Sequence, residues 1–128
     1  MKLRFIAFSA LLSVFLPTTP AVAHHSNVAF FVNKIITVTG IVKEFRWVNP
    51  HTFIYLTADD GKGGKVEWVC EGRAPGVLGR AGWSRNSVKA GETVTIDMSP
   101  AKDGTKTGLV ARVTKSDGTI LPNAPSQE

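Results

Sequence analysis

Apolar and polar residues alternate along most of the chain from Ile35 onward, and short runs of turn residues interrupt the alternation. A period of two residues predicts β-strands, because successive side chains of a strand point to opposite faces. The expected strands cover residues 35–48, 51–57, 65–71, 93–98 and 107–115. Residues 73–84 lose the alternation, and the run Pro75-Gly76-Val77-Leu78 predicts a short helix between the third and fourth strands.

The first strand changes phase along its length. Ile36, Val38 and Val42 share one parity, whereas Phe45 and Trp47 share the other, so we expect a bulge or coil near Gly40. Three strands, a helix and two further strands, with a long bent first strand, are the element order of an OB-type barrel. The sequence therefore predicts an all-β fold, a small OB-like five-stranded barrel with one short helix between strands 3 and 4. A two-sheet sandwich is the competing all-β fold, but five strands are few for it.

The N-terminus has the features of a secretory signal. Lys2 and Arg4 precede an apolar run over residues 5–16, and small residues at Ala21 and Ala23 suit a signal peptidase. The run is about a dozen residues, against roughly twenty for a membrane-spanning helix. We expect cleavage after Ala23, export to the periplasm or secretion, and no transmembrane segment in the mature chain. The predicted organisation is a signal peptide (1–23), a lead-in (24–34), an OB-like barrel domain (35–121) and a disordered tail (122–128).

Charge and cysteine content narrow the functional classes. Removing Lys2 and Arg4 lowers the formal net charge from +5 to about +3, so the mature domain is only mildly basic and no nucleic-acid partner is expected. Cys70 is the only cysteine, which excludes an intramolecular disulfide. Strand parity places it beside Trp68 on the core face, so we interpret it as a buried, inert thiol. Glu67 and Glu71 share the opposite face and are expected to be solvated carboxylates.

The three histidines of the chain suggest a copper site. Cleavage after Ala23 would give His24 a free α-amine and an imidazole, and His51 could add a third nitrogen. Copper(II) prefers tetragonal sites of nitrogen and oxygen ligands, and the α-amine titrates near 7.7 to 8.0. His25 points away from His24 in an extended segment, so both bind one ion only if the terminus turns. If Ala23 stays on the chain, the amine, two backbone amides and His25 could instead form a square-planar site without His51.

Simpler interpretations and other functions remain open at this point. The histidine pair can be a polar tail, and His51 can cap the Asn49-Pro50 turn. A ligand- or partner-binding barrel face is a second hypothesis, because OB-type barrels bind ligands on such faces. Its candidate residues are Trp47, Tyr55, Trp83 and Arg85. A third is an accessory subunit docked to an envelope or membrane-protein partner. No nucleophile elbow, phosphate loop or zinc-helix motif occurs, so no enzymatic activity is indicated.

Several short motifs also resemble a bacterial family of exported proteins known as domain of unknown function 6152. The motifs follow one another along the mature chain: His24-His25-Ser26, Gly40-Ile41-Val42, Trp47-Val48-Asn49-Pro50-His51, Glu67-Trp68-Val69-Cys70-Glu71, Gly82-Trp83-Ser84-Arg85, Lys89-Ala90-Gly91-Glu92 and Lys102-Asp103-Gly104. The resemblance implies no particular activity. The chain departs from the family pattern at Phe30-Phe31-Val32, where an aromatic-acidic pair is usual, and at Cys70, where an apolar residue is usual.

Overall fold

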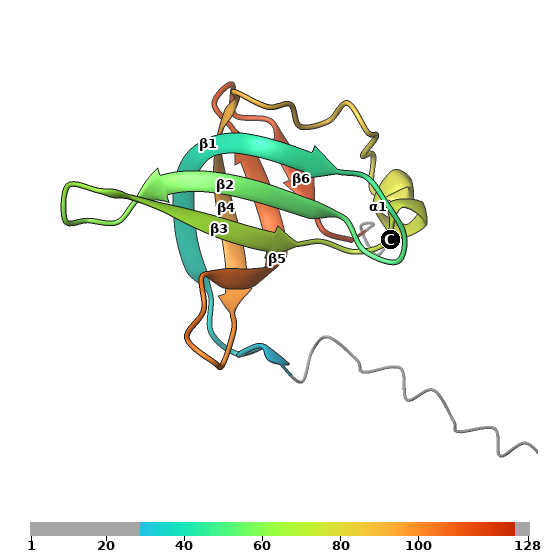
Figure 1. Cartoon of the computed structure of the whole chain (residues 1–128). Coiled ribbons are helices and arrows are strands. Elements are labelled where there is room, and N and C mark those ends of the chain that lie inside the picture. The colour runs from blue at the N-terminus through green and yellow to red at the C-terminus, as the bar shows by residue number, and fades with distance from the viewer. Residues whose placement is uncertain (1–28, 125–128) are drawn as a thin grey trace, which may run out of the picture.

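The computed structural model describes residues 29–124, in which five strands close into a barrel and a sixth strand adds to its edge (Figure 1). The predicted signal peptide, His24, His25 and residues 125–128 of the predicted tail lie outside the described residues. The elements are β1 (Ile36–Arg46), β2 (Phe53–Asp59), β3 (Lys65–Glu71), α1 (Pro75–Arg80), β4 (Thr93–Pro100), β5 (Thr107–Lys115) and β6 (Ile120–Pro122).

The strand order confirms the predicted OB-like barrel. The sheet runs β3-β2-β1-β4-β5-β6, and a parallel pairing of β3 with β5 closes it into a barrel. The single helix lies between β3 and β4, as the sequence predicted. The short strand β6, which pairs with the second half of β5, is not among the five strands expected from the sequence.

The bend of β1 lets one strand pair on both sides. Its first half pairs with β4 and its second half with β2, and the register shifts between Val42 and Glu44. The predicted change of phase is therefore present, but it lies at Lys43 rather than near Gly40. Gly40 serves a different purpose: a Cβ there would lie 2.5 Å from the carbonyl oxygen of Thr57, so only glycine allows β1 and β2 to approach this closely.

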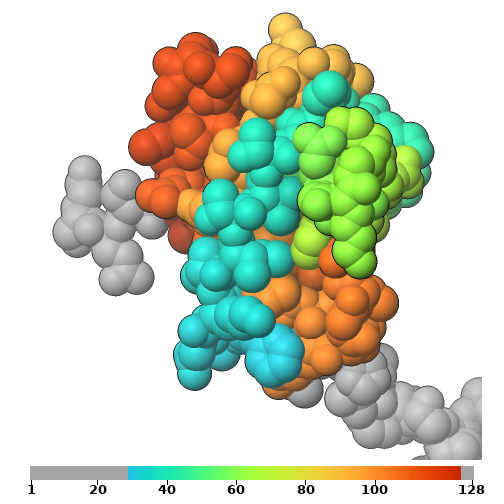
Figure 2. Space-filling model, turned by 90° about the vertical axis from the view of Figure 1, so that its left-hand side faces the viewer, coloured from blue at the N-terminus to red at the C-terminus, as the bar shows by residue number. Residues whose placement is uncertain are grey.

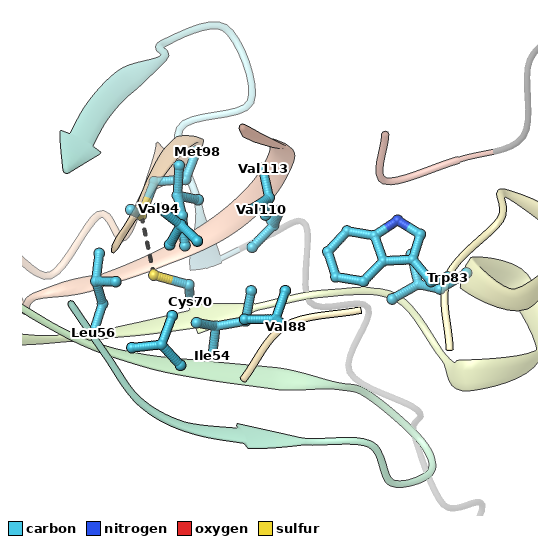
Figure 3. Packing of buried hydrophobic residues seen from close by; sticks show 12 residues of the cluster. Ile54, Leu56, Cys70, Trp83, Val88, Val94, Met98, Val110 and Val113 are labelled. Carbon is cyan, nitrogen blue, oxygen red and sulfur yellow. Dashed lines mark hydrogen bonds between the residues drawn. The ribbon is translucent and has the colours of Figure 1, made fainter. Parts of the chain in front are cut away.

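The interior of the barrel is filled by alternate residues from its strands (Figure 3). The largest fully buried side chains include Leu56, Ile96 and Met98. Burying each such side chain stabilises the fold by about 1.5–3 kcal/mol. Close packing also explains Gly108 on β5, because a Cβ there would lie 2.1 Å from the sulfur of Met98. A glycine at this position gives Met98 room beside the closing strand.

The helix α1 covers one end of the barrel (Figure 1). Pro75 occupies its first turn, where a missing backbone N–H costs nothing, and Leu78 is buried. Trp83 follows the helix and joins the same apolar cluster. Within residues 29–124, no helix is long and apolar enough to cross a membrane.

Candidate functional site

The connection between β1 and β2 is hydrogen-bonded to the residues at the end of β3. The buried Thr52 receives a backbone hydrogen bond from Gly72 at 2.8 Å, and its own backbone N–H and hydroxyl both donate to the carbonyl of Arg73, at 3.2 and 3.0 Å. A Cβ on Gly72 would lie 2.4 Å from the Thr52 hydroxyl oxygen, so this contact requires glycine. The residues before Thr52 are thus held beside the residues before Gly72.

This fastening brings His51 against Glu71. The Nδ1 atom of His51 lies 2.6 Å from Oε1 of Glu71, and the side chains are 37% and 14% exposed. His51 is the residue before Thr52, and Glu71 is the residue before Gly72, so the backbone hydrogen bonds fix both partners. The contact corrects the expectation that Glu71 is merely a solvated carboxylate. His51 is likewise occupied with a carboxylate rather than with capping the Asn49-Pro50 turn.

The contact with Glu71 involves one ring nitrogen of His51 and leaves the other without a partner in the described part of the chain. Nδ1 is the ring nitrogen that faces the carboxylate, and this favours the tautomer with the proton on Nδ1 and the lone pair on Nε2. Within residues 29–124, no hydrogen bond reaches Nε2. A histidine held by a carboxylate through one ring nitrogen, with the other nitrogen open, is the usual arrangement around a metal-binding histidine.

The other two predicted metal ligands, His24 and His25, lie outside the described residues. Among residues 29–124, no three side chains of histidine, cysteine, aspartate or glutamate are grouped so that they could hold a metal ion. His51 can therefore supply one metal ligand, but residues 29–124 do not hold a complete set of three such ligands.

Cys70 does not contribute to this site. It is fully buried, and its Sγ lies 3.9 Å from the sulfur of Met98 (Figure 3). Burial raises the pKa of the thiol to about 12, because the apolar surroundings disfavour the thiolate. This confirms the interpretation of Cys70 as an inert core residue.

The four residues of the predicted ligand face do not share one surface. Trp83 is 5% exposed, and its indole N–H donates to the carbonyl of Pro122 at 2.8 Å. Trp47 is half-buried against the same core, and both tryptophans contact Phe45, at ring centroid distances of 5.9 and 6.0 Å. These large rings are used to fill the end of a small barrel, so Trp83 is not available as an exposed stacking platform.

The other two members of that prediction lie elsewhere. Tyr55 alternates with the buried Ile54 and Leu56, so it is on the outer face of β2. There it lies beside Phe53, with a ring centroid distance of 6.5 Å, and under Arg46, whose guanidinium carbon is 4.9 Å from the Tyr55 ring centroid. Arg85 is exposed in the segment after α1. The outer face of β2 therefore carries a small aromatic and basic strip without either tryptophan.

A separate hollow of about 350 Å³ lies at the opposite end of the β2–β3 hairpin. Figure 2 shows the face on which the start of β1, the β2–β3 turn and the β4–β5 turn lie beside one another. Trp68 lines the hollow, and the ammonium of Lys106 lies 5.2 Å from its ring centroid. Since Lys106 covers this ring, the hollow does not present a free aromatic surface.

Glu71 is the residue that reasoning from the sequence missed as a partner of His51. In the β2–β3 hairpin, Phe53 pairs with Glu71. His51, two residues before Phe53, is therefore the diagonal neighbour of Glu71 on the same side of the hairpin. Carrying the hairpin register two residues beyond β2 would have found the contact.

A model of the protein family of unknown function DUF6152 matches residues 11–112, which is most of the 128 residues. The chain belongs to this family. The match confirms the resemblance seen in the short motifs. The structure shows that this member of DUF6152 folds as a small β-barrel. No curated protein matches the chain.

Proposed function

We propose that this DUF6152 protein is exported and binds copper(II) through Nε2 of His51 and nitrogen ligands of the processed N-terminus. After cleavage following Ala23, His24 supplies its α-amine and its imidazole, and His51 completes a set of three nitrogens. The observation that carries the proposal is the 2.6 Å contact between His51 and Glu71, which leaves Nε2 of His51 as the open ring nitrogen.

The chemistry of the ligands favours copper over other common divalent metals. Three nitrogens without a thiolate suit the tetragonal preference of copper(II), which also heads the affinity order for such sites. An α-amine titrates near 7.7 to 8.0, so a useful fraction is deprotonated at neutral pH. The thiol of Cys70 is buried and protonated, so no thiolate competes for the metal.

The segment from His24 to Phe30 is about as long as the path from Phe30 to Glu71, the residue that contacts His51. Phe30 pairs with Ala101, Ala101 donates its backbone N–H to Thr107, and Leu109, two residues on, pairs with Glu71. This path spans about 21 Å at the most, at about 4.8 Å per neighbouring strand and 3.3 Å per residue. The six residues from Phe30 back to His24 reach about 20 Å when extended, and the side chains add several ångströms.

The point of cleavage decides which nitrogens are available. If Ala23 remains on the mature chain, His25 becomes the third residue, and the amine, two backbone amides and His25 form a complete square-planar set. Copper binding would then not involve His51. The intact mass of the exported protein distinguishes these two forms before any metal is added.

The test is a copper(II) titration of the exported, processed protein, followed by electron paramagnetic resonance. The proposal expects hyperfine structure from three nitrogens, and a loss of affinity of about 100-fold or more in His51→Ala. Glu71→Gln should lower affinity by about 10- to 100-fold, because the orienting carboxylate is lost. Glu67→Gln is the matched control: it lies on the same face of β3 and pairs with Lys43, and it should leave affinity unchanged.

Two outcomes would overturn this assignment in different ways. If replacing His24 and His25 abolishes binding while His51→Ala has no effect, the N-terminal set alone binds copper and His51 is not a ligand. If all of these variants bind copper as the parent does, or if the spectrum is that of free copper, the protein has no such copper site.

A further inference from the structure

A groove of about 500 Å³ lies on the outer surface of the barrel, where β5 changes its pairing partner. The first part of β5 pairs with β3 as far as Leu109, and its second part pairs with β6 from Arg112 onward. The groove lies over this change of partner, between the lead-in before β1 and the residues that follow β3 and β6. Its volume is within the range of small-molecule binding sites, about 300–1,000 Å³.

The walls of the groove are largely apolar. Val32 and Ile35 of the lead-in form one side and are 56% and 54% exposed. Leu109 and Ala111 of β5 and Pro122 of β6 continue the apolar lining. Two aliphatic side chains that are more than half exposed beside a groove are available to cover an apolar ligand.

One hydroxyl lining the groove makes no hydrogen bond within the described part of the chain and is reached by solvent. Ser99 of β4 lines the groove, and no hydrogen bond from residues 29–124 involves its hydroxyl. A hydroxyl in this position is ready to donate to a ligand.

Two more donors stand at the end of the same groove. The side-chain oxygen of Asn123 accepts the backbone N–H of Arg73 at 3.3 Å, which leaves the amide NH₂ of Asn123 to donate. The guanidinium of Arg73 forms none of the ion pairs found within residues 29–124. The backbone of Arg73 is held by Thr52 and Asn123, so the start of this side chain is fixed beside the groove.

We propose that this groove binds an amphipathic monocarboxylate of the fatty-acid class. Arg73 pairs with the carboxylate, Ser99 and Asn123 offer neutral donors to it, and the acyl chain lies along Val32, Ile35 and Leu109. A guanidinium beside apolar walls matches an anionic head on an apolar chain, and a neutral alcohol of equal length lacks the charge that Arg73 recognises. This site is independent of the copper proposal.

The experiment is a nuclear magnetic resonance titration of the ¹⁵N-labelled exported protein with sodium octanoate, and with 1-octanol as the uncharged probe. Octanoate should shift the amides of Ser99, Leu109 and Asn123 in a saturable manner, and 1-octanol should bind about tenfold more weakly or worse. Arg73→Gln should weaken octanoate binding by about tenfold or more, as expected for a lost charge-assisted hydrogen bond. Arg80→Gln removes another exposed arginine, outside the groove, and should change the affinity for octanoate by less than about twofold.

Several results would refute the proposal. The proposal is wrong if octanoate and 1-octanol bind equally well, or if Arg73→Gln and Arg80→Gln weaken octanoate binding equally. It is also wrong if the groove residues show no saturable shift. A short apolar peptide with a free C-terminal carboxylate that binds more tightly than octanoate would assign the groove to a protein partner instead. Arg73 is exposed, so its replacement should not change the unfolding temperature, and a melting curve of each variant checks this.

Discussion

The burial of the Cys70 thiol predicts how much the free energy of unfolding falls at alkaline pH. Burial raises its pKa from the ordinary value of 9.0 to about 12. A thiol whose pKa is raised by folding holds its proton more firmly in the folded chain than in the unfolded one. Its contribution to stability is therefore complete below about pH 9 and is lost as the pH rises toward 12.

The size of the loss follows from the two pKa values. Each pH unit between them costs about 1.4 kcal/mol, so the thiol should lower the free energy of unfolding by roughly 1.4 kcal/mol at pH 10 and roughly 4 kcal/mol above pH 12. Tyrosine and lysine residues titrate in the same range. The prediction therefore concerns the difference between the parent protein and Cys70→Ala, in which the other groups are unchanged.

Urea unfolding of both proteins at pH 8, 9 and 10 measures this difference. Cys70→Ala is expected to be the less stable protein at pH 8, because the contact of Cys70 with Met98 is lost. The gap should narrow by about 1.4 kcal/mol on going to pH 10. A gap that stays constant across this range would show that the thiol is accessible in the folded protein, and would refute its placement in a water-free core.

Two further predictions concern packing and surface charge. Gly108→Ala should destabilise the fold by about 1–3 kcal/mol in urea unfolding, because its Cβ would lie 2.1 Å from the Met98 sulfur; an unchanged midpoint would contradict this packing. Hydrogen bonds from Thr37 and Arg112 lower the pKa of Asp97 below its ordinary 3.8. The ionised carboxylate therefore stabilises the folded protein above pH 3.8, and this stabilisation is lost as the pH falls through the lowered pKa. Asp97→Asn should therefore cost about 1 kcal/mol at pH 7, and its difference in stability from the parent should shrink as the pH falls below 3.8 through the lowered pKa.

The barrel could be predicted from the sequence because its signals are local. The alternation of Val66, Trp68 and Cys70 depends only on the period of a strand, and the structure places Cys70 in the core as expected. The phase change along β1 was visible as well, although its position was not. A bulge can be placed at any of several neighbouring residues without altering the parity of Phe45.

The candidate site was less predictable because it depends on contacts between distant segments. Trp83 is a core residue because it packs at the end of the barrel that α1 covers. No local sequence pattern reveals this packing, so the sequence left open whether Trp83 is exposed for stacking. The pairing of His51 with Glu71 requires the hairpin register and the fastening of Thr52 to Arg73. The sequence singled out His51 as a candidate, and the fold places the carboxylate of Glu71 beside it.

The end of β3 connects the two proposed sites through three consecutive residues. Glu71 contacts His51, and Arg73 lines the groove. Gly72 between them must lack a side chain, because a Cβ would lie 2.4 Å from the hydroxyl oxygen of Thr52. The same hydrogen bonds between Thr52 and residues 72–73 therefore hold both side chains in place. A change at Gly72 should disturb both sites together, whereas Glu71→Gln and Arg73→Gln each act on one, so the two proposals can fail separately.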